Sequence, residues 1–265
     1  MSHKDKQAIR QESNIDTGIS DNDTIFEKEE FIPPSQWGDE NKVEKAVVEK
    51  NLLGIRQKIA HCNVKIIAVT KYFGTDAIKT AYELGIRDFA ESRAVESIKK
   101  IESLPEEVKQ NSTFHFIGHL QSNKVNKVVK TFNLIHSVDS IKIASEISKA
   151  ACSINKREKV LLQVNNAGEE QKTGYTKEQL KKDLPEILKL EGIEVCGLMN
   201  MAPLNAEEKV LNELFEDIRL FRDNLEKDFG IKLEELSMGM SNDYEIAIKH
   251  GATIIRVGRK LFSKI

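Results

Sequence analysis

Residues 64–70 read Val-Lys-Ile-Ile-Ala-Val-Thr, a short run rich in β-branched residues, and Lys71 follows it directly. Such a run is typical of a strand covered on both faces, as in a parallel sheet flanked by helices. The residues before it, from about 42 to 60, predict an amphipathic helix. Its apolar positions are spaced by four, three and four residues: Val48, Leu52, Ile55 and Ile59. The ordered part of the chain is therefore expected to begin with a helix and a buried strand.

The same alternation of strand and helix continues to the end of the chain. We expect further strands at 87–91, 113–117, 134–138, 159–164, 193–199, 233–237 and 253–257. We expect helices at 75–84, 93–104, 139–155, 176–190, 205–230 and 242–250. Asp139 is predicted to cap one helix, and Asn205 with Glu208 resembles a capping box for another. Eight such units predict an α/β fold, a single (β/α)8 TIM barrel with an N-terminal helix. A doubly wound open sheet is the alternative, which periodicity alone does not exclude.

Composition excludes several classes of protein. The chain has 265 residues, of which 40% are hydrophobic and 31% charged, and its longest apolar runs are far shorter than the roughly 20 residues of a transmembrane helix. The first residues contain no apolar stretch of the kind found in signal peptides. Forty basic residues against 42 acidic ones give no excess of positive charge for nucleic acid. We expect a cytoplasmic protein without a nucleic-acid or membrane partner.

The cysteines and histidines do not indicate a metal site. Cys62, Cys152 and Cys196 are far apart and form no CxxC pair, so neither a disulfide framework nor a cysteine zinc site is expected. His115 and His136 lie within predicted strands, where packing and catalysis are equally open interpretations.

Charge is uneven along the chain. Residues 1–40 hold ten acidic and four basic side chains, a net charge of −6, and they lack apolar periodicity. This composition predicts a disordered acidic leader at 1–40, followed by one barrel domain at 41–265.

Candidate functional residues gather where the predicted strands end, because barrels place their sites at the carboxyl ends of strands. The seventh strand continues into a loop of small residues containing Ser241, and the eighth contains Arg256 and continues into Arg259. A small-residue loop entering a helix can bind phosphate through backbone N–H groups and a hydroxyl, and the arginines would add positive charge. The alternative is an ordinary turn in which Ser241 caps the helix.

Lys71 ends the first strand and has two interpretations. A lysine in this place usually faces solvent, but a desolvated one can act as a nucleophile. Together with a phosphate site on the same rim, it suggests a phosphorylated aldehyde held as a Schiff base. Pyridoxal 5′-phosphate (PLP) is one such aldehyde. A sugar-phosphate aldolase would use the same two parts.

Several motifs together resemble the YggS/PROSC family of PLP homeostasis proteins. In chain order they lie at 68–71, 115–124, 136–140, 197–199, 237–243 and 256–258, and the resemblance covers about 42–265. That family is similar to the N-terminal barrel of alanine racemase, a fold type III PLP-binding domain. The resemblance implies that Lys71 carries PLP as a Schiff base. It places around the phosphate and ring Ser241, Arg256 and Gly258, with Met240 and Asn242 in the same loop.

Two positions depart from the family pattern. Ser92 stands where the family often has asparagine on the cofactor side, and Arg259 stands where it often has threonine or serine. Both are kept as candidate cofactor contacts, although Arg259 can equally point to solvent.

The resemblance implies a binding protein rather than an enzyme. Alanine racemases take their second acid/base from a tyrosine of a separate C-terminal domain, for which we expect no room after Ile265. We therefore expect a PLP-binding protein for vitamin B6 homeostasis with little or no turnover. PLP-dependent apoenzymes would be its acceptors, and it would be a monomer or weak dimer. The alternative is a racemase-like PLP enzyme with a compact one-domain site.

Overall fold

The eight predicted strands form a closed parallel barrel. The computed structural model describes residues 43–169 and 171–264. The strands follow one another in chain order around the barrel, and the ring closes between the first and the last. They are β1 (Lys65–Val69), β2 (Asp88–Glu91), β3 (Thr113–Phe116), β4 (Leu134–Val138), β5 (Glu158–Gln163), β6 (Ile193–Met199), β7 (Glu235–Ser237) and β8 (Ile254–Val257). Closure confirms the barrel and excludes the open sheet.

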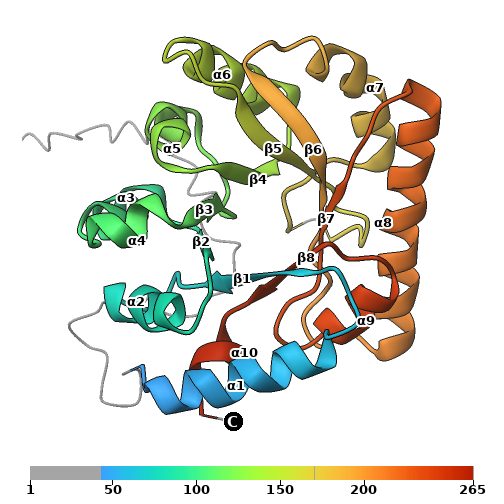
Figure 1. Cartoon of the computed structure of the whole chain (residues 1–265). Coiled ribbons are helices and arrows are strands. Elements are labelled where there is room, and N and C mark those ends of the chain that lie inside the picture. Colours follow the sequence, from blue (N-terminus) through green and yellow to red (C-terminus); the bar gives the residue numbers. More distant parts are fainter. Residues whose placement is uncertain (1–42, 170, 265) are drawn as a thin grey trace, which may run out of the picture. The chain divides into compact units, whose positions relative to one another are not determined.

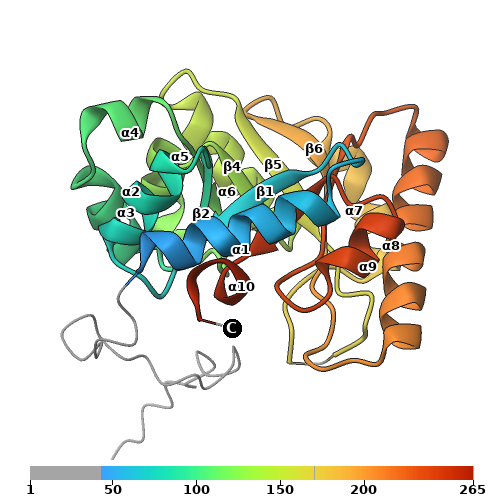
Figure 2. The same ribbon diagram turned by 60° about the horizontal axis from the view of Figure 1, so that its bottom comes forward.

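Helices surround the strands, as Figure 1 and Figure 2 show. They are α1 (Lys45–Lys58), α2 (Thr75–Glu83), α3 (Ala94–Glu102), α4 (Glu106–Gln110), α5 (Val125–Thr131), α6 (Ile141–Cys152), α7 (Lys177–Ile187), α8 (Glu208–Phe229), α9 (Tyr244–Lys249) and α10 (Arg259–Phe262). A 3₁₀ turn, Ser122–Lys124, precedes α5. The helix predicted before the first strand is confirmed by α1. The acidic leader predicted at 1–40 lies outside the described residues.

Two predicted helix caps are wrong. The N-cap of α6 is Ser140 instead of Asp139, and the Ser140 hydroxyl accepts a hydrogen bond from the Ile143 N–H at 3.4 Å. The proposed capping box at Asn205 does not form, because α8 begins at Glu208 without a side-chain cap. Asn205 instead has φ 56°, the left-handed conformation that asparagine tolerates in turns.

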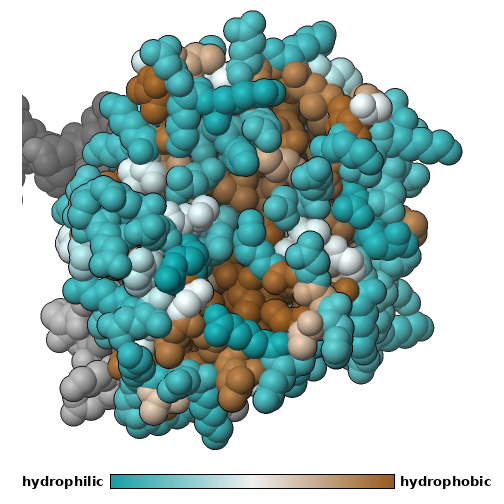
Figure 3. Space-filling model, viewed as in Figure 1, coloured by the Kyte–Doolittle hydropathy of each residue, from teal (hydrophilic) through white to brown (hydrophobic). Residues whose placement is uncertain are grey.

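Apolar side chains form two cores. The larger one lies between the strands and the helices, and the smaller one takes one residue from each of six strands. Its buried members are Ile67, Ala90, Leu134, Leu161, Met199 and Ile254. Residues from six strands can meet in this way only inside the barrel. On the face drawn in Figure 3, apolar side chains gather near the middle and hydrophilic ones surround them.

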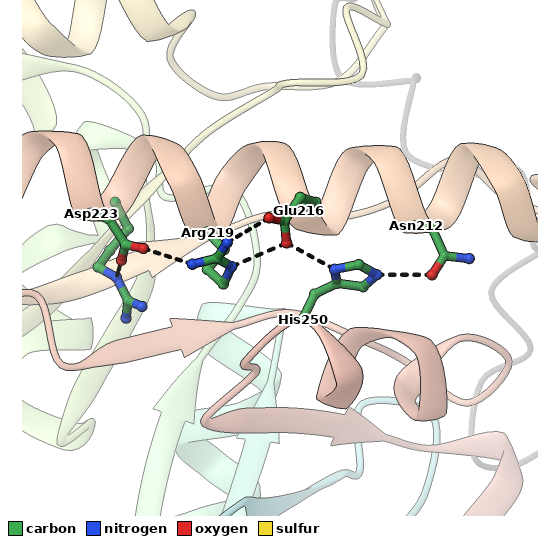
Figure 4. Close-up of polar contacts among 6 residues, drawn as sticks. Asn212, Glu216, Arg219, Asp223 and His250 are labelled. Carbon is green, nitrogen blue, oxygen red and sulfur yellow. Dashed lines mark hydrogen bonds and ion pairs between the residues drawn. The ribbon is translucent and has the colours of Figure 1, made fainter.

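A polar cluster joins α8 to the end of α9 (Figure 4). Nδ1 of His250 lies 3.0 Å from a carboxylate oxygen of Glu216, and Nε2 lies 2.8 Å from Oδ1 of Asn212. Arg219 also donates to Glu216 and, one turn further along α8, to Asp223. The hydrogen bonds from Arg219 and then His250 lower the pKa of Glu216 to about 2. Helix α8 is thus tied to the C-terminal end of α9, the helix that follows β7, by charge-assisted hydrogen bonds.

None of the helices within residues 43–169 and 171–264 is long and apolar enough to cross a membrane.

Candidate functional site

Lys71 stands at the carboxyl end of β1, in the turn that follows the strand. Ile67 belongs to the core inside the barrel and Val69 packs against it, so the inward-facing side of β1 runs to its last residue. Lys71 follows in the turn, and its Nζ lies 4.5 Å from the centre of the Tyr72 ring. Phe73 N–H donates to the Thr70 carbonyl at 2.9 Å and closes the turn. The side chain of Lys71 is partly exposed. The structure therefore places a partly exposed lysine in the turn at the carboxyl end of β1.

Gly258 lies beside this end of β1. A Cβ built on Gly258 would be 3.3 Å from the Val69 carbonyl oxygen, a tight contact, and 3.4 Å from the Val69 Cβ. The strand register also places Gly258 beside the end of β1, because Ala68 of β1 pairs with Val257 of β8, the residue before Gly258. Gly258 and Lys71 thus lie at the same rim, after adjacent strands. The backbone packs closely there because position 258 has no side chain.

Ser241 connects the loop after β7 with the loop after β8. Its hydroxyl accepts a hydrogen bond from the Lys260 N–H at 3.2 Å. It does not cap α9, because Asp243 occupies the N-cap position and its Oδ1 accepts from the Met240 N–H. Of the two interpretations of Ser241, the capping role is therefore wrong. The hydroxyl lies instead where two rim loops meet.

The Ser241 loop depends on Gly239. This glycine has φ 88°, and a Cβ there would lie 2.7 Å from the Cβ of Ala247. Residues with side chains rarely adopt that φ, so the loop that carries Met240, Ser241 and Asn242 requires glycine at its start.

Arg256 is a buried cation inside the barrel. Its side chain is 3% exposed and donates to the Ser237 hydroxyl at 2.7 Å and to the Asn200 carbonyl at 2.8 Å. Burial lowers its pKa to about 10, so the guanidinium stays protonated at neutral pH. Two fixed acceptors hold the charge in one orientation.

Arg256 is the end of a chain of hydrogen bonds through the barrel interior. Ser237 Oγ lies 2.9 Å from Nδ1 of His136, whose Nε2 lies 3.0 Å from Nδ1 of His115. Nε2 of His115 lies 3.0 Å from the Asp88 carboxylate. The chain joins Asp88 at the start of β2 to Arg256 near the end of β8. Both histidines are thus packed in the barrel interior, as one of the two interpretations expected, and their ring nitrogens have hydrogen-bond partners there.

Which atom donates and which accepts in this series of hydrogen bonds follows from its two ends, Asp88 and Arg256. Burial lowers the pKa of both His115 and His136, so both rings are neutral at pH 7. The Asp88 carboxylate only accepts, so His115 donates from Nε2 and accepts at Nδ1. His136 then donates from Nε2, and its Nδ1 accepts from the Ser237 hydroxyl. Every proton of the chain is thereby assigned.

The remaining predicted residues have different surroundings. Ser92 follows the end of β2, two residues beyond Ala90 of the inner core, and its backbone approaches Gly118 so closely that a Cβ there would be 1.9 Å from the Ser92 oxygen. Arg259 is the first residue of α10 and its side chain is exposed. Ser92 thus lies at the rim, and the exposed Arg259 begins the helix that follows Gly258.

No group of three or more His, Cys, Asp or Glu side chains within the described part of the chain is arranged to hold a metal ion. The same region contains all three cysteines, and each is a free thiol.

Known proteins share both the sequence and the fold. Residues 43–264 match the family model described as alanine racemase, N-terminal domain. The chain is 44% identical over 200 residues to a pyridoxal phosphate homeostasis protein of Synechocystis, which covers 76% of this chain and 91% of that protein. It is 38% identical to the protein of the same name from Aquifex aeolicus, covering 76% of this chain and 86% of the relative.

Solved structures also resemble this chain in fold and, for PipY, in sequence. PipY of Synechococcus elongatus, solved without PLP, superposes with a TM-score of 0.77 at 36% identity, covering 82% of this chain and all of PipY. The form of PipY with PLP bound gives a TM-score of 0.74 at 35% identity. An alanine racemase of Clostridium difficile has a TM-score of 0.68 but only 17% identity, over 84% of this chain and 58% of the racemase, and therefore shares the fold alone. On these matches, the chain belongs to the family of pyridoxal phosphate homeostasis proteins, whose barrel is that of the alanine racemase N-terminal domain.

Proposed function

We propose that this protein binds PLP covalently through Lys71 and acts in PLP homeostasis, with little or no catalytic turnover. The observation that carries the proposal is the position of Lys71, a partly exposed lysine in the turn directly after β1, at the carboxyl end of a strand whose Ile67 faces the barrel interior. The names of its relatives and the PLP-bound PipY structure support it.

The residues at the rim fit this cofactor. The primary amine of Lys71 suits the aldehyde of PLP. The Ser241 hydroxyl suits the phosphate, and the buried Arg256 guanidinium suits the pyridine ring. Gly258 packs closely against Val69 and has no side chain, so no side chain at this position covers the backbone that follows β8. Phosphate binding by backbone N–H groups requires such an uncovered backbone.

Each residue then has a distinct role. Bound PLP would supply an electrophilic aldehyde carbon, and Lys71 would hold the cofactor there through its amine. Ser241 donates its hydroxyl hydrogen to the phosphate, and the Gly258 backbone lines the phosphate site. Arg256 presents a fixed positive charge to the ring, and Met240, Asn242, Ser92 and Arg259 complete the rim.

The wider role is also a proposal. PLP-dependent apoenzymes would receive the cofactor in the cytoplasm, from a monomer or weak dimer. The free thiols Cys62, Cys152 and Cys196 suit a reducing compartment.

Absorbance and mass mapping test the proposal. Apo protein titrated with PLP should develop a yellow band that borohydride bleaches, and the reduced label should map to Lys71. Lys71→Ala should abolish the label, whereas Lys79→Ala, which changes an exposed lysine of α2, should keep it. Labelling elsewhere, or a colourless protein, would contradict covalent binding at Lys71. Racemisation of D- or L-alanine that depends on Lys71 would contradict the binding role and favour an enzyme.

A further inference from the structure

An ion pair between Lys100 of α3 and Glu91 of β2 lies behind the turn that carries Lys71. Nζ of Lys100 is 2.5 Å from Oε1 of Glu91, and the side chains are 14% and 2% exposed. Glu91 follows Ala90, an inner-core residue, so it points away from the barrel interior toward the helices. Removing two charges from water costs free energy, so a buried pair by itself is weak evidence of stabilisation. The other contacts of Lys100 and Glu91 indicate that the pair holds the backbone of the neighbouring turn in place.

Lys100 ties together both ends of the turn around Lys71. Besides Glu91, its ammonium donates to the Thr70 carbonyl and to the Phe73 carbonyl, each at 2.8 Å. An ammonium group has three hydrogens, and these three acceptors use all of them. Lys71 lies between Thr70 and Phe73. A single cation therefore binds the backbone on both sides of it.

Glu91 fixes the same turn from a second direction. Its Oε1 also accepts from the Thr70 hydroxyl at 2.6 Å, and its Oε2 accepts from Ser97 at 3.2 Å. The Thr70 N–H donates to the Ala90 carbonyl at 3.0 Å. Thr70 is thus held through its N–H, its carbonyl and its side chain. The residue immediately before Lys71 has little freedom left.

We propose that Lys100 and Glu91 are positioning residues, which hold the backbone of the 70–73 turn so that the Lys71 amine reaches the aldehyde carbon of bound PLP. The inference rests on the proposed function. Lys100 and Glu91 lie outside the barrel interior and need not touch the cofactor. They act on the step in which the amine meets the aldehyde, where a misplacement of about 1 Å costs up to roughly 100-fold in rate.

The test separates capture of the aldehyde from binding of the cofactor's ring and phosphate. Pyridoxine 5′-phosphate has the same ring and phosphate as PLP but an alcohol instead of the aldehyde, so it binds without Lys71. Two quantities are measured for each variant: the rate constant of yellow-band formation with PLP, and the dissociation constant of pyridoxine 5′-phosphate. Lys100→Met is compared with Lys99→Met, which changes the exposed neighbour on the same helix.

Lys100→Met should slow PLP capture by about 10- to 100-fold and change the dissociation constant of pyridoxine 5′-phosphate by less than about twofold. Lys99→Met should change neither. Lys100→Arg should restore part of the rate, because it keeps the charge but not the ammonium geometry.

Unchanged capture in Lys100→Met, or an equal loss for both ligands, would overturn the inference. If Lys100→Met does not fold, Glu91→Gln decides by the same two criteria. Failure of the wild-type protein to capture PLP at Lys71 would instead refute the proposed function itself.

Discussion

The Ser237 hydroxyl lies 2.7 Å from Nη1 of Arg256 and accepts its hydrogen bond inside the barrel. The Ser237 hydroxyl also donates to Nδ1 of His136. The orientation of the buried Arg256 guanidinium therefore depends on Ser237, which belongs to the neighbouring strand β7. A guanidinium held in this way presents a fixed charge to a ligand at the rim.

Arg256→Gln should weaken PLP retention. The change removes the buried positive charge that would face the cofactor, and a hydrogen bond to a charged group is worth roughly 1.5–3 kcal/mol. Since 1.4 kcal/mol corresponds to a factor of ten, we expect PLP affinity to fall by about tenfold or more. Equilibrium dialysis with PLP measures it. Arg56→Gln, at an arginine of α1 that contacts the Leu84 carbonyl, is the control. An affinity equal to that of the wild type would refute contact between Arg256 and the cofactor.

Ser237→Ala should destabilise the protein and loosen Arg256. It leaves the buried Nδ1 of His136 without a donor and takes one acceptor from the guanidinium, at a cost of about 1–3 kcal/mol. The free energy of unfolding in urea measures this cost. Ser140→Ala, which removes a helix cap and a 3.3 Å hydrogen bond to Asp139, should cost about 1 kcal/mol and leave PLP binding unchanged. Equal PLP affinity in Ser237→Ala and the wild type would show that the hydroxyl does not orient Arg256.

The barrel and the position of Lys71 could be predicted from sequence because both follow from local patterns. A continuous apolar run identifies a strand between two covered faces, and Lys71 follows directly after that run. The Ser241 loop could be placed at the rim for the same reason. Its contact with Lys260 could not, because it joins loops from two different units.

The polar pairings were missed because they depend on register and helix packing. Asp88 meets His115 across β2 and β3, and Glu91 meets Lys100 nine residues later on the following helix. A single sequence contains no information on which side chains face each other across elements. The signal available was the charged Glu91 at the end of a predicted strand, since a buried carboxylate needs a partner. Asn205 shows the opposite error, because a capping-box pattern also occurs in an ordinary turn.

Glu216→Gln should flatten the loss of stability in acid. Hydrogen bonds from Arg219 and His250 lower the pKa of Glu216 from 4.5 to about 2. A lowered pKa stabilises the folded state above about pH 4.5, and this contribution is lost as the pH falls toward 2. Urea midpoints at pH 6, 4 and 3 should therefore fall less steeply in Glu216→Gln than in the wild type. Glu213→Gln, on the same helix and more exposed, should follow the wild type. Parallel curves for all three proteins would contradict the role of the α8–α9 cluster.

Glu158→Gln should stabilise the protein in alkaline solution. The side chain of Glu158 is fully buried at the start of β5, and burial raises its pKa from 4.5 to about 7 despite the attraction of Lys156. A raised pKa means that the folded state prefers the protonated acid. The wild type therefore loses stability as the pH rises from about 4.5 to 7, by up to about 3 kcal/mol.

Glutamine has no such titration, so the stability of Glu158→Gln should vary less across this range. Lys156 keeps its hydrogen bonds to the Val129 and Phe132 carbonyls and is not left unpaired in the variant. Urea denaturation at pH 5 and pH 8.5 should show a gain of about 1–3 kcal/mol at pH 8.5 and little change at pH 5. Glu191→Gln, at an exposed turn before β6, is the matched control and should show no such difference. A loss of stability at pH 8.5 would mean that the ion pair with Lys156 outweighs the cost of burying the carboxylate.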